Sequence, residues 1–234
     1  MPSLTLPLVE IAALTPRTRL LTLALGPQRF SFTAGQAVML TPPNDTDAKP
    51  YSIASSPERS SSTRHLELLI AIDAAGSPDL EWAERGALVQ IEGPLGSFIL
   101  PDTIDEPCLL FVAGGTGIAP LRSMLDQVLW RDDQRRVALL YSARRADEFA
   151  FIDEFRSYAA ASRLRLHETV TRDDSSWQGH RGRVGRADFE AVLEDPAGTL
   201  CYVCGPPAMV NESVATLQAL GVPAGAIRTE QWGK

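Results

Sequence analysis

Two short apolar runs, each ending abruptly at glycine or proline, constrain the fold of this chain most strongly. Residues 108–112 lead into Gly114-Gly115-Thr116-Gly117, and residues 200–204 lead into Gly205-Pro206-Pro207. A helix-like pattern follows each run, so we expect two strands of a parallel sheet, each opening at its carboxyl end into a turn. Ligands of open α/β sheets bind there, because a helix start offers free N–H groups to a phosphate. Glycines at such a turn let the backbone approach an anion closely.

Strand-like and helix-like segments alternate from residue 101 onward. Such alternation is typical of a parallel sheet covered by helices. Strands are predicted at residues 108–112, 137–141, 164–170 and 200–204, and helices at residues 118–130, 146–160, 186–193 and 208–220.

The first hundred residues instead show short strands separated by glycine and proline, which indicates a small antiparallel β-barrel. The predicted strands are residues 17–25, 37–40, 65–72 and 87–91. We expect a helix to begin at Ser77 and a hairpin loop at Ser60-Ser61-Ser62. The chain is therefore predicted to form two domains, residues 1–100 and residues 101–234, with the acidic, proline-containing segment 101–107 at the boundary.

The composition excludes several classes of protein. With 44% hydrophobic and 22% charged residues, the chain is ordinary globular protein. No apolar run is long enough to span a bilayer and no signal pattern opens the sequence, so a cytoplasmic location is expected. Three cysteines without metal-binding spacing argue against disulfides and iron–sulfur clusters, and we expect no metal site. The net charge of −7 disfavours nucleic-acid binding.

Four motifs in order carry a family resemblance. They are Lys49-Pro50-Tyr51-Ser52, the Gly-Pro-Leu-Gly-Ser-Phe of residues 93–98, Gly114-Gly115-Thr116-Gly117 with Ala119-Pro120, and Cys204-Gly205-Pro206-Pro207. In order and spacing they resemble the ferredoxin–NADP reductase superfamily, of the stand-alone reductase type, over essentially the whole chain. The resemblance implies a flavin-binding antiparallel β-barrel followed by an α/β parallel-sheet domain that binds the nicotinamide nucleotide.

The resemblance also implies a flavin site. Tyr51 would lie against the flavin ring, Ser52 would donate a hydrogen bond toward flavin N5, and Lys49 would pair with a flavin phosphate in place of the family's arginine. Gly76 and Ser77 would meet the pyrophosphate, which favours FAD over FMN. The flavin-binding residues implied in this way are Lys49, Pro50, Tyr51, Ser52, Ile53, Gly76, Ser77 and Trp232.

For the nicotinamide nucleotide, the resemblance implies that Cys204 lies beside the nicotinamide ring and that Glu230 polarises the site. The catalytic residues it implies are thus Ser52, Cys204 and Glu230. Arginines after successive strands favour NADPH over NADH, although a solvated basic surface is the alternative. The nucleotide-binding residues implied are Gly114, Gly115, Thr116, Gly117, Arg144, Arg172, Arg183, Cys204, Gly205 and Pro206.

The activity implied is hydride transfer from NADPH or NADH to bound FAD, followed by electron transfer to a separate acceptor. An iron–sulfur protein or an oxygenase component is the expected partner. The open alternatives are a reductase of free flavin or small molecules, and a non-turnover electron-transfer subunit of a larger complex. A degenerate fold that binds a nucleotide for regulation is a further alternative, disfavoured by the intact motifs.

Overall fold

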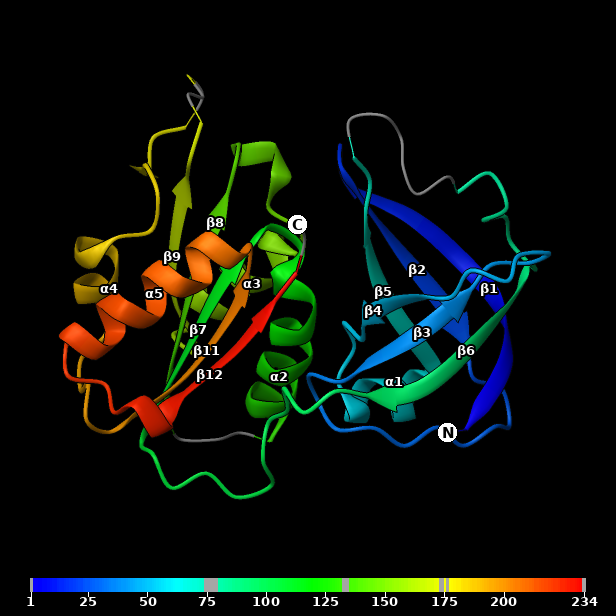
Figure 1. The fold of residues 1–234 in the computed structure, drawn as a ribbon, viewed down its shortest axis with the longest axis horizontal. Coiled ribbons are helices and arrows are strands. Elements are labelled where there is room, and N and C mark those ends of the chain that lie inside the picture. The colour runs from blue at the N-terminus through cyan, green and yellow to red at the C-terminus, as the bar shows by residue number, and fades with distance from the viewer. Residues whose placement is uncertain (1, 74–79, 132–134, 173–174, 176, 233–234) are drawn as a thin grey trace. The chain divides into compact units, whose positions relative to one another are not determined.

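The computed structural model describes residues 2–73, 80–131, 135–172, 175 and 177–232. The chain forms two compact units, drawn in Figure 1. The first comprises Met1–Leu100 together with Arg122–Asp132, and the second comprises Pro101–Leu121 together with Asp133–Lys234. The chain passes from the first unit to the second between Leu100 and Pro101, and the segment Arg122–Asp132 returns to the first.

The first unit is built on an antiparallel sheet with the strand order β4-β3-β6-β1-β2-β5. An antiparallel bridge between Ile53 and Leu68 joins the end of β4 to β5, so the sheet closes into a barrel, as the sequence predicted. The strands are β1 (Ser3–Thr15), β2 (Thr18–Ala24), β3 (Ala37–Thr41), β4 (Lys49–Ser52), β5 (His65–Ala71) and β6 (Leu88–Leu95).

Alternating apolar residues fill the barrel. On β5, Leu66, Leu68 and Ile70 form the apolar side predicted from the sequence, and all three are fully buried. Leu21 and Leu23 on the neighbouring strand β2 are buried with them in the same core. Residues two apart on a strand point to the same face, so each strand contributes one apolar side to the interior.

The serine-rich segment forms a helix, and the hairpin loop predicted there is wrong. Helix α1 (Pro57–Thr63) begins after Ser56, whose side-chain oxygen accepts a hydrogen bond from the Arg59 N–H at 3.0 Å. Proline at the first helical position fits without losing a bond, so this start outweighs the low helix propensity of three serines. The helix expected from Ser77 lies largely outside the described residues, and residues 80–86 form turns.

The second unit contains a parallel sheet with the strand order β10-β9-β8-β7-β11-β12, which confirms the predicted α/β fold. Its strands are β7 (Cys108–Gly114), β8 (Arg136–Ala143), β9 (Arg165–Val170), β10 (His180–Arg181), β11 (Thr199–Gly205) and β12 (Ile227–Gln231). The order reverses between β7 and β11, and such a reversal is where ligands of open α/β sheets bind. The sequence analysis did not predict β10 or β12, the two edge strands.

The helices follow the strands as expected, with one interruption. They are α2 (Ile118–Trp130), α3 (Ile152–Ala160), α4 (Arg186–Val192) and α5 (Pro207–Ala219), with short 3-10 helices η1 (Gly115–Gly117), η2 (Ala146–Glu148) and η3 (Ala224–Ala226). The helix predicted over residues 146–160 is divided into η2 and α3, because Phe151 adopts a left-handed conformation with φ of 60°. No helix in the described part of the chain is both long and apolar enough to cross a membrane.

Buried charges fix the Arg122–Asp132 segment within the first unit. Arg122 is only 3% exposed, and its Nη1 lies 2.6 Å from Oε2 of Glu67 on β5. The same nitrogen donates a hydrogen bond to the Ala54 carbonyl at 3.0 Å. Asp126 accepts hydrogen bonds from Arg59 and from the Ser56 hydroxyl, both at the start of α1. These bonds satisfy charges that would otherwise be costly to bury.

We predict that Glu67→Gln lowers the free energy of unfolding of this unit by about 3 kcal/mol, because it removes the carboxylate that lies 2.6 Å from the buried Arg122 guanidinium. Urea unfolding followed by fluorescence measures the change. Asp47→Asn is the control, since it breaks the exposed ion pair between Asp47 and Lys49 in the same unit, and we expect it to cost about 0–1 kcal/mol. Equal losses of unfolding free energy in the two variants would show that the buried pair of Arg122 and Glu67 stabilises the unit no more than an exposed ion pair does.

Candidate functional site

The carboxyl ends of β7 and β11 lie side by side in the second unit, where the strand order reverses. The two strands pair in parallel with Cys204 opposite Ala113. The turn Gly114–Gly117 therefore lies next to Gly205 and Pro206. The sequence predicted two parallel strands that end in these turns, and the structure shows that they are neighbours. Figure 1 shows these central strands, β7 in green beside β11 in orange.

Three glycines allow these two strand ends to pack together. A Cβ on Gly117 would overlap the carbonyl of Cys204, and a Cβ on Gly205 would lie 3.1 Å from the Gly114 Cα. A Cβ on Gly114 would lie 2.6 Å from the Met209 sulfur. These positions exclude a side chain because the protein itself fills the space, whereas the sequence analysis explained the glycines by the approach of an anion.

Gly115 differs from its neighbours and fits the expected anion site. Its φ is +54°, and nothing lies within 4 Å of the position a Cβ would take. Gly115 is exposed and Thr116 is half-buried, in a turn that leads directly into α2. The first N–H groups of a helix have no partner within the helix, so this turn suits a pyrophosphate.

Tyr141 holds this turn in place and was missed by the sequence analysis. Its hydroxyl donates a hydrogen bond to the Gly115 carbonyl at 3.2 Å and accepts one from the Ala150 N–H at 3.1 Å. The sequence does contain a signal for this role, because Tyr141 ends the predicted strand of residues 137–141. That strand neighbours β7 in the sheet.

The structure brings Cys204, Glu230 and Trp232 together at the end of β11. Strand β12 pairs with β11 so that Glu230 lies opposite Cys204. The Cys204 sulfur is 4.0 Å from Oε2 of Glu230, and the Trp232 indole N–H donates to that same oxygen at 2.7 Å. The backbone N–H of Trp232 donates to the Gly205 carbonyl at 3.1 Å. Trp232 is thus held by backbone and side-chain bonds where the strand order of the sheet reverses.

Burial shifts the pKa values of Cys204 and Glu230. Burial raises the pKa of the Cys204 thiol well above its usual value, and the nearby Glu230 carboxylate raises it further. Burial also raises the pKa of Glu230, while the bond from Trp232 opposes that shift. The Cys204 side chain is 0% exposed. It is therefore a neutral thiol near pH 7 and not a thiolate nucleophile.

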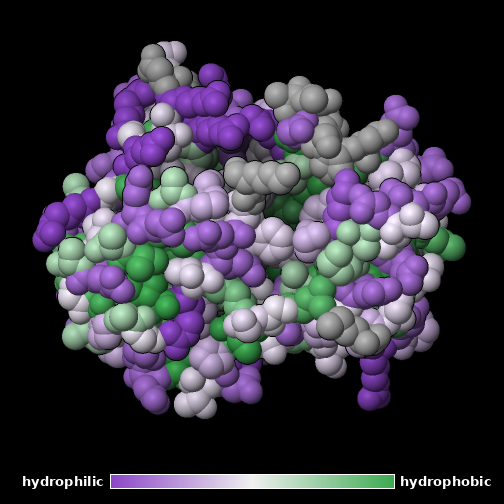
Figure 2. Space-filling view, in the orientation of Figure 1, coloured by the Kyte–Doolittle hydropathy of each residue, from purple (hydrophilic) through white to green (hydrophobic). Residues whose placement is uncertain are grey.

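The predicted arginines lie at the ends of β8, β9 and β10. Arg144, Arg172 and Arg183 are all exposed. The Arg172 N–H donates to the Arg144 carbonyl at 2.9 Å, so these two residues are adjacent. Arg183 instead forms an exposed ion pair with Glu212 of α5 at 3.7 Å. Figure 2 shows hydrophilic side chains over the upper left of the view, where Figure 1 places the ends of β8 and β9.

The predicted flavin residues that the structure describes lie mainly on β4 of the first unit. Lys49 is exposed and lies 3.9 Å from Asp47, whereas Ser52 and the following Ile53 are buried. The Tyr51 ring is half-buried, and burial raises the pKa of its hydroxyl. A half-buried ring retains a surface for stacking, and a buried serine hydroxyl offers a donor, so these residues fit a flavin.

The other predicted flavin residues lie elsewhere. Pro50, also on β4, is exposed. Gly76 and Ser77 lie outside the described residues. Trp232 belongs to the second unit, in the group with Glu230 described above.

Each of the two units matches a known protein family. Residues 5–99 match the family described as the oxidoreductase FAD-binding domain, and residues 111–214 match the oxidoreductase NAD-binding domain. Over 236 aligned residues, the chain is 34% identical to ferredoxin–NADP reductase B of Sorangium cellulosum, covering 96% of each protein. The chain belongs to the ferredoxin–NADP reductase superfamily. Its two matched segments are an oxidoreductase FAD-binding domain and an oxidoreductase NAD-binding domain, the cofactors of which are FAD and NAD(P)H.

Two further members of this superfamily are longer proteins. The chain is 31% identical over 192 residues to the reductase component DmpP of phenol 2-monooxygenase from Pseudomonas sp. strain CF600, covering 80% of this chain and 53% of that protein. It thus spans about half the length of that relative. The solved ferredoxin reductase in carbazole 1,9a-dioxygenase has a TM-score of 0.85 and 25% identity, covering 99% of this chain and 70% of the other.

We predict that Gly117→Ala weakens NADPH binding at least tenfold and destabilises the second unit by about 1–3 kcal/mol, because the added methyl group must displace the Cys204 backbone. Nucleotide titration and thermal unfolding measure the two effects. Gly225→Ala is the matched control, since nothing lies within 4 Å of its Cβ position. Normal binding by Gly117→Ala would mean that the two strand ends separate without consequence for the site.

Proposed function

We propose that this flavoprotein takes hydride from NAD(P)H onto bound FAD and passes electrons to a separate iron–sulfur protein or oxygenase component. The arrangement at the end of β11 carries the proposal, because it combines an open phosphate-binding turn at Gly115 with the neutral thiol of Cys204. The names of two relatives support the choice of acceptor, since each is the reductase of an oxygenase system. The expected cytoplasmic location stays a prediction.

The chain's own residues position the two cofactors in this proposal. Gly115 and Thr116 would hold the pyrophosphate of the nucleotide, and the buried Cys204 would shape the site beside the nicotinamide. Tyr51 would hold the flavin by stacking, and Ser52 would donate a hydrogen bond to it. When bound, FAD would supply the redox chemistry that joins a two-electron donor to a one-electron acceptor.

Glu230 and Trp232 have a positioning role in this proposal. Trp232 donates to Oε2 of Glu230, the same oxygen that lies 4.0 Å from the Cys204 sulfur. The carboxylate therefore fixes the indole and the thiol relative to each other. This arrangement supports the assignment of Glu230 to the nicotinamide side of the reaction. The shielding of the flavin by Trp232 stays a prediction.

NADPH is the proposed donor, with NADH as the alternative. Arg144 and Arg172 are exposed and their backbones are hydrogen-bonded at the ends of β8 and β9, which suits a phosphate bound by both. A 2′-phosphate requires such charge, whereas a ribose diol is usually bound by a carboxylate.

We predict that Cys204→Ala slows flavin reduction by NADPH about tenfold, equivalent to about 1.4 kcal/mol of barrier, with the flavin content unchanged. The reason is that the smaller side chain leaves the nicotinamide less well positioned. Stopped-flow absorbance of the flavin measures the rate. Cys201→Ala is the control, because Cys201 is equally buried, on the same strand. Equal rates in the two variants would reduce Cys204 to a packing residue.

The proposed function is tested by mixing the flavin-loaded protein with NADPH or NADH and then with acceptors. We expect faster reduction by NADPH, and we expect Arg144→Ala to weaken NADPH binding about tenfold, since one phosphate contact is lost, without affecting NADH. Arg165→Ala is the control, because Arg165 lies at the opposite end of β9 and forms an ion pair with Glu194. Faster reduction by NADH would refute the nucleotide preference.

The acceptor step separates the remaining alternatives. Reoxidation by a [2Fe–2S] protein much faster than by free FMN or a quinone supports the proposed partner. Preference for free FMN or the quinone indicates a small-molecule reductase. A flavin that neither nicotinamide reduces indicates a subunit with little turnover of its own.

A further inference from the structure

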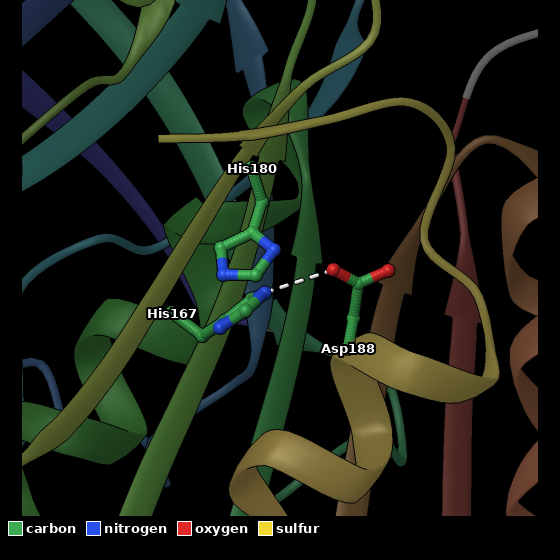
Figure 3. A group of neighbouring side chains, drawn as sticks. All are labelled: His167, His180 and Asp188. Carbon is green, nitrogen blue, oxygen red and sulfur yellow. Dashed lines mark hydrogen bonds and ion pairs between the residues drawn. The ribbon is translucent and has the colours of Figure 1, made fainter. Parts of the chain in front are cut away.

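Two histidines and an aspartate meet on the second unit, apart from every residue assigned above. His167 lies on β9, His180 opens β10 and Asp188 lies on α4. One potential ligand atom from each lies within 4.8 Å of the other two, and no other such group of three occurs among the residues that the structure describes. Figure 3 shows the two imidazole rings and the carboxylate converging from these three elements.

The geometry within this group is close. Nε2 of His167 lies 2.8 Å from Oδ1 of Asp188, and the two imidazole centroids are 4.2 Å apart. The parallel bridge between His180 and Thr169 sets the spacing of the two histidines, because Thr169 and His167 are two residues apart on β9. Strand pairing therefore holds both rings on one side of the sheet edge.

Further hydrogen bonds fix the Asp188 side chain and the His180 backbone. Oδ2 of Asp188 accepts from the Gly185 N–H at 2.9 Å, which leaves Oδ1 directed at His167. The Trp177 indole N–H donates to the His180 carbonyl at 2.8 Å and fixes the backbone of that residue. Such outer bonds are typical of metal ligands, whose orientation they fix.

The ligand types select one class of ion. Two imidazole nitrogens and one carboxylate oxygen suit Zn²⁺ and related divalent transition metals, and three protein ligands leave a coordination position for water. Ca²⁺ and Mg²⁺ prefer oxygen ligands throughout. His167 is 8% exposed whereas His180 is exposed, so an ion can enter from solvent and His180 can adjust to it.

The geometry points to a Zn²⁺ site formed by His167, His180, Asp188 and water. The ion binds the lone pair of Nε2 in the neutral imidazole of His167, and the proton on Nε2 is exchanged through solvent for one on Nδ1. Zinc bonds of about 2.0–2.1 Å place tetrahedral ligands about 3.3 Å apart, so the 2.8 Å contact opens by about 0.5 Å. The sequence analysis predicted no metal site. His167 and His180 are thirteen positions apart and Asp188 lies on a helix, so the three residues approach one another only in the folded protein.

A bound ion would join three elements at the edge of the sheet. Strand β10 has only two residues and is paired with β9 alone in the described structure. An ion bound by His167, His180 and Asp188 would link β10 to both β9 and α4. The site involves none of the residues proposed to bind FAD or the nicotinamide nucleotide, so it stands or falls independently of the proposed function.

The test is calorimetric titration of the 234-residue protein with ZnCl₂. We expect one ion per chain, with affinity reduced at least tenfold in His180→Gln and in Asp188→Asn. His65→Gln is the matched control, because the chain has three histidines and His65 lies on β5 of the first unit. Circular dichroism verifies that each variant is folded. Because His180 is exposed, His180→Gln should fold, and it decides the test if Asp188→Asn does not.

Two results would overturn the site. One is the absence of stoichiometric Zn²⁺ binding by the unmodified protein, which would leave the His167–Asp188 contact as an ordinary hydrogen bond. The other is unchanged affinity in folded His180→Gln. Flavin content and reduction rate measured on the same samples keep this outcome separate from any failure of the proposed oxidoreductase function.

Discussion

The close approach of β7 and β11 is the constraint on which the nucleotide-binding unit depends. Gly114, Gly117 and Gly205 have no room for a side chain, because backbone or Met209 atoms occupy that space. Only Gly115 faces open space within this group. The motif Gly-Gly-Thr-Gly thus combines two requirements: its outer glycines allow two strand ends to pack, and its second glycine and threonine form the turn available to a phosphate.

Charge, as well as apolar packing, organises the flavin-binding unit. The segment Arg122–Asp132 places Arg122 against Glu67 and Asp126 against Arg59. Burial alone would raise the pKa of Asp126, but the bonds from Arg59 and Ser56 outweigh it and hold the pKa below its usual value. The stability from this carboxylate is therefore present near neutral pH and is lost as the pH falls through its lowered pKa. Part of the barrel's stability depends on residues far from it in sequence.

Local patterns allowed much of the fold to be predicted, and tertiary contacts explain what was missed. The helix Ile118–Trp130 was predicted to the residue, because its apolar spacing is unambiguous. Helix α1 was missed because three serines outweighed the capping signal of Ser56 and Pro57. Strand β12 has no fully buried residue and offers little apolar pattern. The group of His167, His180 and Asp188 has no local signature, since the pairing of β9 with β10 and the packing of α4 create it.

The predicted role of Cys204 is narrowed by the burial that the structure reveals. A thiol placed after a strand could serve as a nucleophile if a positive charge lowered its pKa. Here burial and the Glu230 carboxylate both raise that pKa. A neutral, fully buried thiol contributes shape and polarizability instead of covalent chemistry. Hydride transfer needs no protein nucleophile, so the electrostatics of this site agree with a reaction carried by the cofactors alone.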